Sequence, residues 1–315
     1  MFLHHWWEGA FPRPERPPSR AAAAAIVTAV IGVVMLHGIV PSGADGARNS
    51  TSSGVDTEHL FGFTEGTDIG AAGEKEVEVD STFRSGKHTG SFATAASEIE
   101  FKYTAFENFR ISAAATLAYY DIVGVAGMKD RRQAAAQSVS FDARFRLLDR
   151  DRAPFGLTLS VEPHWGFADE TSGVRIDHFG IEMLLRADRE IVPDRLFGGL
   201  NLLFDTDRTR LLAAGGIEQE PTLGIGAAIA AKVASGVWIG GEARYLRSYD
   251  GAALNTFSGQ GIYLGPTLYA RLGERGWLSA AWNFQAWGVA AGISGTLDLV
   301  NFERHQLKFR VGYEF

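Results

Sequence analysis

The sequence predicts an all-β chain that folds as a single antiparallel transmembrane β-barrel of about 12 strands. The first observation is the strict alternation at the C-terminus, where every second residue is apolar: Leu307, Phe309, Val311, Tyr313 and Phe315. Such a strand has one face in an apolar medium and the other in a polar one. The second is that short and long connections alternate along the chain, as they do in membrane barrels. The third is a mean hydropathy of −0.03, which suits a barrel because half of each strand faces water.

Twelve runs with strand character follow Glu74, bounded by Gly, Pro, Asp and Asn. They cover residues 76–84, 98–104, 109–120, 139–147, 157–165, 176–188, 196–205, 221–232, 237–247, 261–272, 277–287 and 303–315. The Gly- and Ala-rich stretch 223–241 is also compatible with a transmembrane helix. Its alternation of large and small residues, and the turn residues at 234–236, instead predict a hairpin.

The connections divide into two classes. Those at 105–108, 149–154, 190–194, 234–236 and 273–276 are short, and those at 123–136, 207–219, 248–259 and 289–301 are long. Two further connections, 85–90 and 168–173, fall at positions expected to be long but are short. An even number of strands places both ends of the barrel on the same side of the membrane, and tight periplasmic turns put that side in the periplasm. A soluble β-sandwich would also alternate, but it offers no reason for a terminal aromatic.

The chain is expected to have three parts. Residues 1–44 form a predicted export signal peptide, because Arg13, Arg16 and Arg20 precede an uncharged stretch and small residues end at Ala44. A permanent membrane helix is the alternative, since the stretch approaches the ~20 residues that span a bilayer. Residues 45–72 are expected to form a periplasmic N-terminal segment or a plug. Residues 73–315 form the predicted transmembrane barrel.

Tyr313 and the terminal Phe315 resemble the C-terminal assembly signal of bacterial outer-membrane β-barrels. Four stretches, 61–68, 155–158, 162–166 and 301–306, are together similar to poorly characterised exported barrels of alphaproteobacteria. A looser similarity is to transporter-like barrels linked with aromatic-compound degradation. The resemblance implies a porin-like protein of the bacterial outer membrane, with outer-membrane lipid and the barrel assembly machinery as partners. It carries over no functional residues, and the sequence does not determine the oligomeric state.

If the apolar face of each strand meets lipid, the charged residues between line the lumen. The lumen-lining candidates are Glu76, Glu78, Glu98, Glu100, Lys102, Arg110, Asp142, Arg144, Arg146, Glu162, Glu182, Arg186, Glu242, Arg244, Arg271, Lys308 and Arg310. One hypothesis is that they pair across a hydrated wall. The other is that acidic and basic walls face each other and create a transverse field that orients solutes.

Three predicted outer loops contain apolar runs, at 122–128, 211–217 and 289–293. Water-exposed loops seldom have this composition. They are interpreted either as strand extensions or a common cap, or as an apolar vestibule that collects hydrophobic small molecules.

The sequence indicates neither an enzyme nor a cofactor. The five histidines after residue 44 form no His-x-Ser or His-Glu-x-x-His motif, and Gly-x-Ser-x-Gly is absent. No metal ligand set is predicted, and no cysteine is present. A net charge of −7 without a basic block argues against nucleic acid as a partner. The expected function is passive diffusion or uptake of small solutes, including hydrophobic or aromatic ones. A sealed structural or adhesive barrel and a barrel lipid hydrolase are the alternatives.

Phe315→Ala should lower outer-membrane abundance far more than it lowers the stability of the barrel refolded in detergent. Burial of one aromatic contributes about 1.5–3 kcal/mol, which a barrel of this size tolerates, whereas an assembly signal acts before the barrel forms. Immunoblots of membrane fractions and denaturant titration of the refolded protein measure the two effects, with Glu314→Gln as the control. Normal membrane levels of the Phe315→Ala protein would contradict the assembly signal.

Overall fold

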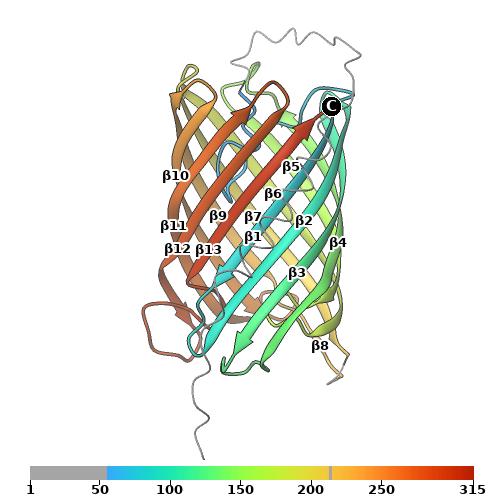
Figure 1. Ribbon diagram of the computed structural model, residues 1–315, viewed down its shortest axis with the longest axis vertical. Coiled ribbons are helices and arrows are strands. Elements are labelled where there is room, and N and C mark those ends of the chain that lie inside the picture. The colour runs from blue at the N-terminus through green and yellow to red at the C-terminus, as the bar shows by residue number, and fades with distance from the viewer. Residues whose placement is uncertain (1–54, 213–214) are drawn as a thin grey trace, which may run out of the picture. The chain divides into compact units, whose positions relative to one another are not determined.

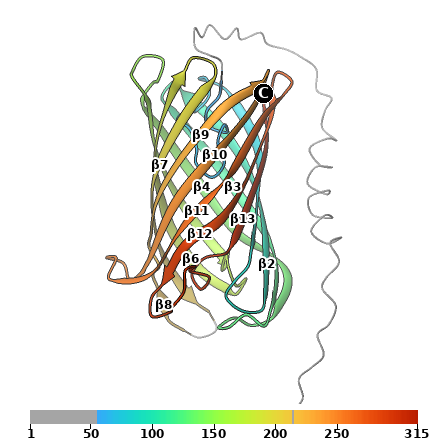
Figure 2. The same cartoon turned by 90° about the vertical axis from the view of Figure 1, so that its left-hand side faces the viewer.

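Residues 55–212 and 215–315 are described by a computed structural model, shown in Figures 1 and 2. Twelve long strands form one closed antiparallel barrel, which confirms the predicted fold. They are β1 (Lys75–Ser85), β2 (Ser91–Phe106), β3 (Phe109–Val123), β4 (Arg131–Leu148), β5 (Gly156–Ala168), β6 (Arg175–Val192), β7 (Leu196–Leu211), β9 (Thr222–Ala234), β10 (Val237–Asp250), β11 (Thr256–Leu272), β12 (Gly276–Ala290) and β13 (His305–Glu314). The two-residue strand β8 (Ile217–Glu218) lies in the connection after β7 and pairs with it.

Each long strand pairs with its neighbours in the chain, and β1 pairs with β13 to close the ring. Val79 lies opposite Val311 in this closing pair, and Glu76 lies opposite Glu314. Closure gives both edge strands a partner, which is required where a bilayer offers no hydrogen bonds to the backbone. The predicted hairpin at 223–241 is present as β9 and β10.

Several strands extend beyond the sequence pattern that predicted them. Residues 131–136, assigned to a loop, belong to β4, where Ala134 pairs with Tyr119 of β3. The alternation fades in this Arg-Arg-Gln-Ala-Ala-Ala run, but hydrogen bonding to β3 continues the strand. Three of the long connections are therefore shorter than predicted, at residues 124–130, 212–221 and 251–255, whereas the last, at residues 291–304, is slightly longer. Residues 303–304, assigned to the last strand, belong to the final connection.

The two ends of the barrel differ. We call the end at which β13 finishes the C-terminal end and the opposite one the loop end. The C-terminal end carries the tight connections, such as residues 107–108 and 235–236, whereas the wider connections lie at the loop end (Figure 1). This is the alternation expected from the sequence.

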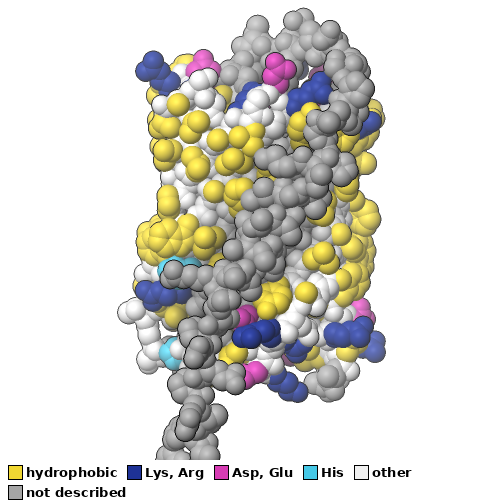
Figure 3. Space-filling model, in the orientation of Figure 1, with side chains coloured by type: hydrophobic (Ala, Val, Ile, Leu, Met, Phe, Trp, Pro, Cys, Tyr) yellow, Lys and Arg dark blue, Asp and Glu magenta, His cyan; other side chains and the backbone are white. Residues whose placement is uncertain are grey.

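The side chains are arranged as in a membrane barrel, with apolar residues outside and polar residues inside. On β2, Phe101 is 60% exposed, whereas the neighbouring Lys102 is 5% exposed and points into the lumen. Hydrophobic side chains cover the visible outer wall in Figure 3, and charged ones gather near its two ends. Tyr313 and Phe315 are also exposed on the outside. Among the described residues, no helix is long and apolar enough to span a bilayer.

Residues 55–74, which we call the inner segment, precede β1 and lie inside the barrel in both views, in the half nearer the C-terminal end (Figures 1 and 2). Leu60, Phe61 and Ile69 of this segment are among the most buried residues of the described chain. The predicted export signal at 1–44, and residues 45–54 of the expected N-terminal segment, lie outside the described residues.

Candidate functional site

The inner segment contacts the barrel wall around its whole circumference. Its acidic side chains reach β2, β3, β4, β6 and β13, and its backbone bonds to side chains of β5, β7 and β10. Its apolar residues pack against β7, β9, β10, β11 and β12. A chain segment that touches every side of the lumen at one level obstructs passage through that level.

Glu58 is the centre of the first group of ion pairs. Its carboxylate accepts a two-pronged hydrogen bond from the Arg110 guanidinium, with Nη2 2.6 Å from Oε1. Lys102 Nζ is 3.1 Å and Arg144 Nη1 2.9 Å from the same oxygen. All four side chains are buried. Three neighbouring strands thus direct cations to one carboxylate of the inner segment.

Glu65 is the centre of the second group. Arg186 Nη2 lies 2.8 Å from its carboxylate, and Arg144 and Arg310 each approach it to 3.5 Å. Burial of the Glu65 carboxylate would raise its pKa, but the surrounding arginines hold the pKa well below its usual value. Glu65 is therefore ionised at neutral pH and acts as the counter-ion of three buried arginines.

The backbone of the inner segment is held by polar side chains of the wall. The amides of Phe63 and Thr64 donate to the carboxylate of Glu242 at 3.0 and 2.8 Å. Asn201 accepts from the amide of Glu65 and donates to its carbonyl oxygen. Only the last two residues of the segment, Gly73 and Glu74, bond to the backbone of the described wall, at Thr104 of β2. For residues 55–72 the contacts made by side chains therefore decide whether the segment stays.

An apolar cluster anchors the turn of the inner segment that contains Leu60 and Phe61. These residues pack against Phe197, Trp238, Tyr269 and Trp277, all of which point inward. Gly199 of β7 leaves the space for the ring, because a Cβ at that position would lie 2.8 Å from Phe61. The wall is therefore shaped to receive this segment.

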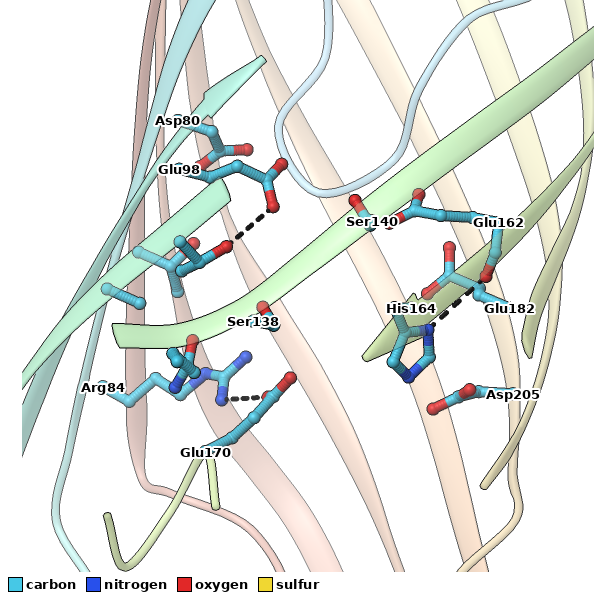
Figure 4. A pocket seen from close by; sticks show the side chains of 14 residues that line it. Asp80, Arg84, Glu98, Ser138, Ser140, Glu162, His164, Glu170, Glu182 and Asp205 are labelled. Carbon is cyan, nitrogen blue, oxygen red and sulfur yellow. Dashed lines mark hydrogen bonds and ion pairs between the residues drawn. The ribbon is translucent and has the colours of Figure 1, made fainter. Parts of the chain in front are cut away.

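A cavity of about 220 Å³ lies between the inner segment and the loop end. β1 runs from the C-terminal end to the loop end, so Asp80, Thr82 and Arg84 in the lining lie farther from the C-terminal end than Glu76 and Glu78. Figure 4 shows the side chains that surround the cavity, which come from β1 to β7 and the connection after β5. Its acidic members are Asp80, Glu98, Glu162, Glu170, Glu182 and Asp205.

Few cations balance these carboxylates. Arg84 pairs with Glu170 at 2.9 Å, and Lys308 pairs with Asp80 at 2.8 Å. The lining also contains one histidine, His164, whose Nε2 lies 3.1 Å from His178 Nε2. The lining is therefore predominantly acidic, which attracts cations.

The lumen-lining candidates divide between these two regions. Buried against or near the inner segment are Glu76, Glu78, Lys102, Arg110, Asp142, Arg144, Arg186, Glu242 and Arg310. Glu98, Glu162 and Glu182 line the cavity. Half-buried at other inward positions are Glu100, Arg146, Arg244 and Lys308. The acidic candidates are thus present in both regions, whereas the basic candidates lie beside the inner segment or at other inward positions and none of them lines the cavity.

Arg271 differs from the other candidates. By the alternation of β11 it should point inward, as Thr267 and Tyr269 do. Its side chain is instead exposed and donates a hydrogen bond to the carbonyl oxygen of Glu274 in the adjacent turn. Because it is the second-last residue of β11, it lies at the rim of the C-terminal end and not on the lumen wall.

Sequence reasoning missed the residues of the inner segment that meet the wall. Glu58, Glu65 and Asp68 are acidic residues in a short stretch before a barrel whose fourth and last strands are rich in basic residues. That complementarity was visible in the sequence. Their individual partners were not, because Glu65 and Arg310 are far apart in the chain.

The apolar runs of the outer loops have different environments. Ile122 and Val125 are buried in a cluster with Phe92, Ala118 and Tyr120, and Ile122 belongs to β3. Leu212, Ile217 and Ile293 are exposed. The first run is therefore a strand extension with an attached cap, whereas these residues of the other two runs lie on the surface.

Comparison with known proteins places the chain in a family. A profile of the family described as "Family of unknown function (DUF6662)" matches residues 53–315, so the chain belongs to this family. No curated protein sequence matches. The COG4313 outer membrane channel from Pseudomonas putida F1 has the same fold, with a TM-score of 0.55 and 8% identity over 79% of this chain and 98% of that one.

Two further solved structures are similar at lower scores. The NanC porin has a TM-score of 0.46 and 9% identity, over 75% of this chain and 98% of that one. The translocator domain of the autotransporter NalP from Neisseria meningitidis has a TM-score of 0.45 and 15% identity, over 79% and 91%. At these identities the likeness concerns the fold.

Glu65→Gln should loosen the inner segment while leaving the barrel folded. Removing one partner of a buried ion pair costs about 3–5 kcal/mol because the remaining charges stay uncompensated. Chymotrypsin digestion in detergent, scored by cleavage after Leu60, Phe61 or Phe63, should accelerate at least about tenfold. Glu107→Gln, in an exposed turn, is the matched control. Equal protection of the two variants would show that Glu65 does not hold the segment.

Acidification should release the inner segment only below the ordinary pKa of glutamate. The pKa of Glu65 is lowered in the folded protein, so its stabilisation is complete above about pH 4.3 and is lost as the pH falls through the lowered value. Pepsin digestion between about pH 2 and 5 should cut the wild-type segment only at the acidic end of that range. The Glu65→Gln protein should be cut throughout. Cleavage of the wild type already at the upper end would contradict the assignment.

Proposed function

We propose that this member of the DUF6662 family is an outer-membrane channel for small solutes, and that the inner segment is a plug that holds the lumen closed. The observation that carries the proposal is the acidic cavity inside a closed barrel, next to a segment that crosses the lumen and is held there by side chains. The shared fold with an outer-membrane channel supports it. Residues 1–44 would direct export, and Phe315 would direct assembly into the outer membrane.

The cavity favours small polar solutes with positive charge. Of the described residues that line it, Ala96 alone is apolar, and six carboxylates face Arg84 and His164. Fixed charges of one sign concentrate solutes of the opposite sign in a pore. This lining gives less support to the hydrophobic or aromatic solutes expected from the sequence, whose collection would need an apolar vestibule.

Opening requires that the plug leave the lumen or shift within it. Burial of Leu60 and Phe61 stabilises the closed state by about 1.5–3 kcal/mol for each side chain. Buried ion pairs add less than their number suggests, because desolvation offsets much of the attraction. The closed state is thus held by interactions that a ligand or a partner protein can outweigh.

A sealed barrel with a structural or adhesive role is the second candidate. The contacts of the inner segment with every side of the wall favour it, since they would also serve a barrel that never opens. The two candidates differ in whether the plug moves, and that difference is measurable.

A disulfide between the plug and the wall should hold the channel closed. A Cβ at Gly226 would lie 3.0 Å from Thr64 Oγ1, so cysteines at these two positions are within the reach of a disulfide. The chain has no other cysteine. In planar bilayers, Thr64→Cys/Gly226→Cys should show no openings when oxidised and should regain them in a reducing agent, which breaks the bond that ties the plug.

The single variants are the controls and should conduct in both conditions. Wild type should open rarely and Glu65→Gln often, because the latter lacks the counter-ion that holds the plug. If the folded wild type, the reduced double variant and Glu65→Gln are all silent, the sealed barrel is the better description.

A further inference from the structure

His59 of the inner segment lies in an unusual environment. Its side chain is 0% exposed, and neither ring nitrogen has a hydrogen-bond partner in the described structure. The ring stacks on Trp277 with centroids 3.6 Å apart and planes inclined by 10°. The stacking fixes the plane of the imidazole, so its nitrogens point at the groups that surround its edge.

Those groups are carboxylates. Three carboxylate oxygens lie close to His59 Nε2: Glu76 Oε1 at 3.4 Å, Asp56 Oδ2 at 3.5 Å and Glu58 Oε2 at 3.6 Å. Glu78 Oε2 lies 3.7 Å from Nδ1. Asp56 and Glu58 belong to the inner segment, whereas Glu76 and Glu78 belong to β1. The cluster therefore joins the plug to the wall.

The separations do not suit hydrogen bonds but suit ligands of a shared ion. Nitrogen–oxygen hydrogen bonds measure about 2.7–3.2 Å, shorter than any of these distances. A tetrahedral metal ion with bonds of about 2.0–2.2 Å to nitrogen and oxygen separates its ligand atoms by about 3.3–3.6 Å. The ligand atoms of Asp56, Glu58 and His59 all lie within 4.8 Å of one another, as do those of His59, Glu76 and Glu78.

The charges leave room for a cation. Five carboxylates meet here: Asp56, Glu58, Glu76, Glu78 and Glu100. The cationic side chains among them are Lys102, Arg110, Arg144 and Arg310. Arg144 is also shared with Asp142 and Glu65, and Arg310 with Glu65. Buried charge needs compensation, and a divalent ion would supply it.

We propose that His59 and the carboxylates of Asp56 and Glu58 bind a divalent transition-metal ion of the Zn²⁺ type, next to Glu76 of β1, whose Oε1 lies 3.4 Å from the same ring nitrogen. An imidazole nitrogen selects such ions over Ca²⁺ and Mg²⁺, which prefer oxygen ligands alone. The Asp56 side chain is 26% exposed, so the site is accessible to an ion. Because the Glu76 carboxylate of β1 lies next to the same nitrogen, the charge of a metal bound by the plug attracts β1 and fastens one to the other. This last role rests on the proposed function.

Metal binding is measured on the full chain in detergent, after removal of metal with a chelator and dialysis. Calorimetric titration with ZnCl₂ should show one ion per chain, and elemental analysis should confirm the stoichiometry. CaCl₂ should bind at least about a hundredfold more weakly, because a nitrogen ligand contributes little to Ca²⁺ binding. Tryptophan emission should change on Zn²⁺ binding because His59 stacks on Trp277, and Trp277→Phe should lose that change while keeping the heat signal.

Two variants on different elements keep the test independent of one side chain. His59→Asn on the plug and Glu76→Gln on β1 should each weaken Zn²⁺ binding at least about tenfold, as loss of ligand-shell groups does. His164→Asn, a histidine in the cavity, should bind Zn²⁺ as the wild type does. Folding of every variant is checked by heat-dependent migration in SDS gels.

The outcomes separate this inference from the channel. Folded wild type that takes up no stoichiometric Zn²⁺, or affinity unchanged in both His59→Asn and Glu76→Gln, overturns the metal site and leaves a protonated His59 paired with carboxylates. Zn²⁺ binding by a barrel that never conducts supports the site and removes the proposed channel. Bilayer openings that Zn²⁺ suppresses in the wild type but not in Glu76→Gln support both.

Discussion

The structure depends on one constraint, which is that a bilayer offers no partner to a backbone amide or carbonyl. Twelve strands satisfy it by closing on themselves through β1 and β13, so that no ladder is left open. Closure has a second consequence. Because neighbouring residues of a strand point to opposite sides, every charged residue kept away from lipid is directed into a narrow lumen. There each charge must find water or a partner.

The lumen meets that demand differently at its two levels. Near the C-terminal end, Arg110, Arg144, Arg186 and Arg310 converge, and the inner segment supplies the carboxylates that pair with them. Toward the loop end the excess charge is negative, and a cavity remains. The inner segment thus has two effects: its carboxylates neutralise the arginines at this level, and its bulk obstructs the lumen. The acidic cavity lies on the loop-end side of the inner segment.

The means by which the segment is held bears on whether it moves. It contributes no strand to the wall, and apart from Gly73 and Glu74, which bond to Thr104 of β2, it is not part of the cooperative ladder that makes the barrel resistant. Its apolar anchor is confined to a few side chains around Leu60 and Phe61. The remaining contacts are charged or polar, and these respond to pH, to competing ions and to metal. Contacts of this kind respond to conditions more readily than the backbone ladder of the barrel does.

Local features of the sequence determined the barrel, and only the tertiary structure decided how its lumen is filled. The alternation at 307–315 predicted the closing strand, and the turn at 234–236 predicted a hairpin. Both could be predicted because side chains of a strand point to opposite faces with a period of two residues, which a short stretch of sequence shows. The loop boundary at 131–136 was wrong because pairing with β3 continues β4 without alternation. Arg271 lies at the rim because the end of β11 is set by its neighbours. The contacts of Glu58, His59 and Glu65 join residues far apart in sequence. No local period encodes such contacts, which arise only when the closed barrel surrounds one short segment.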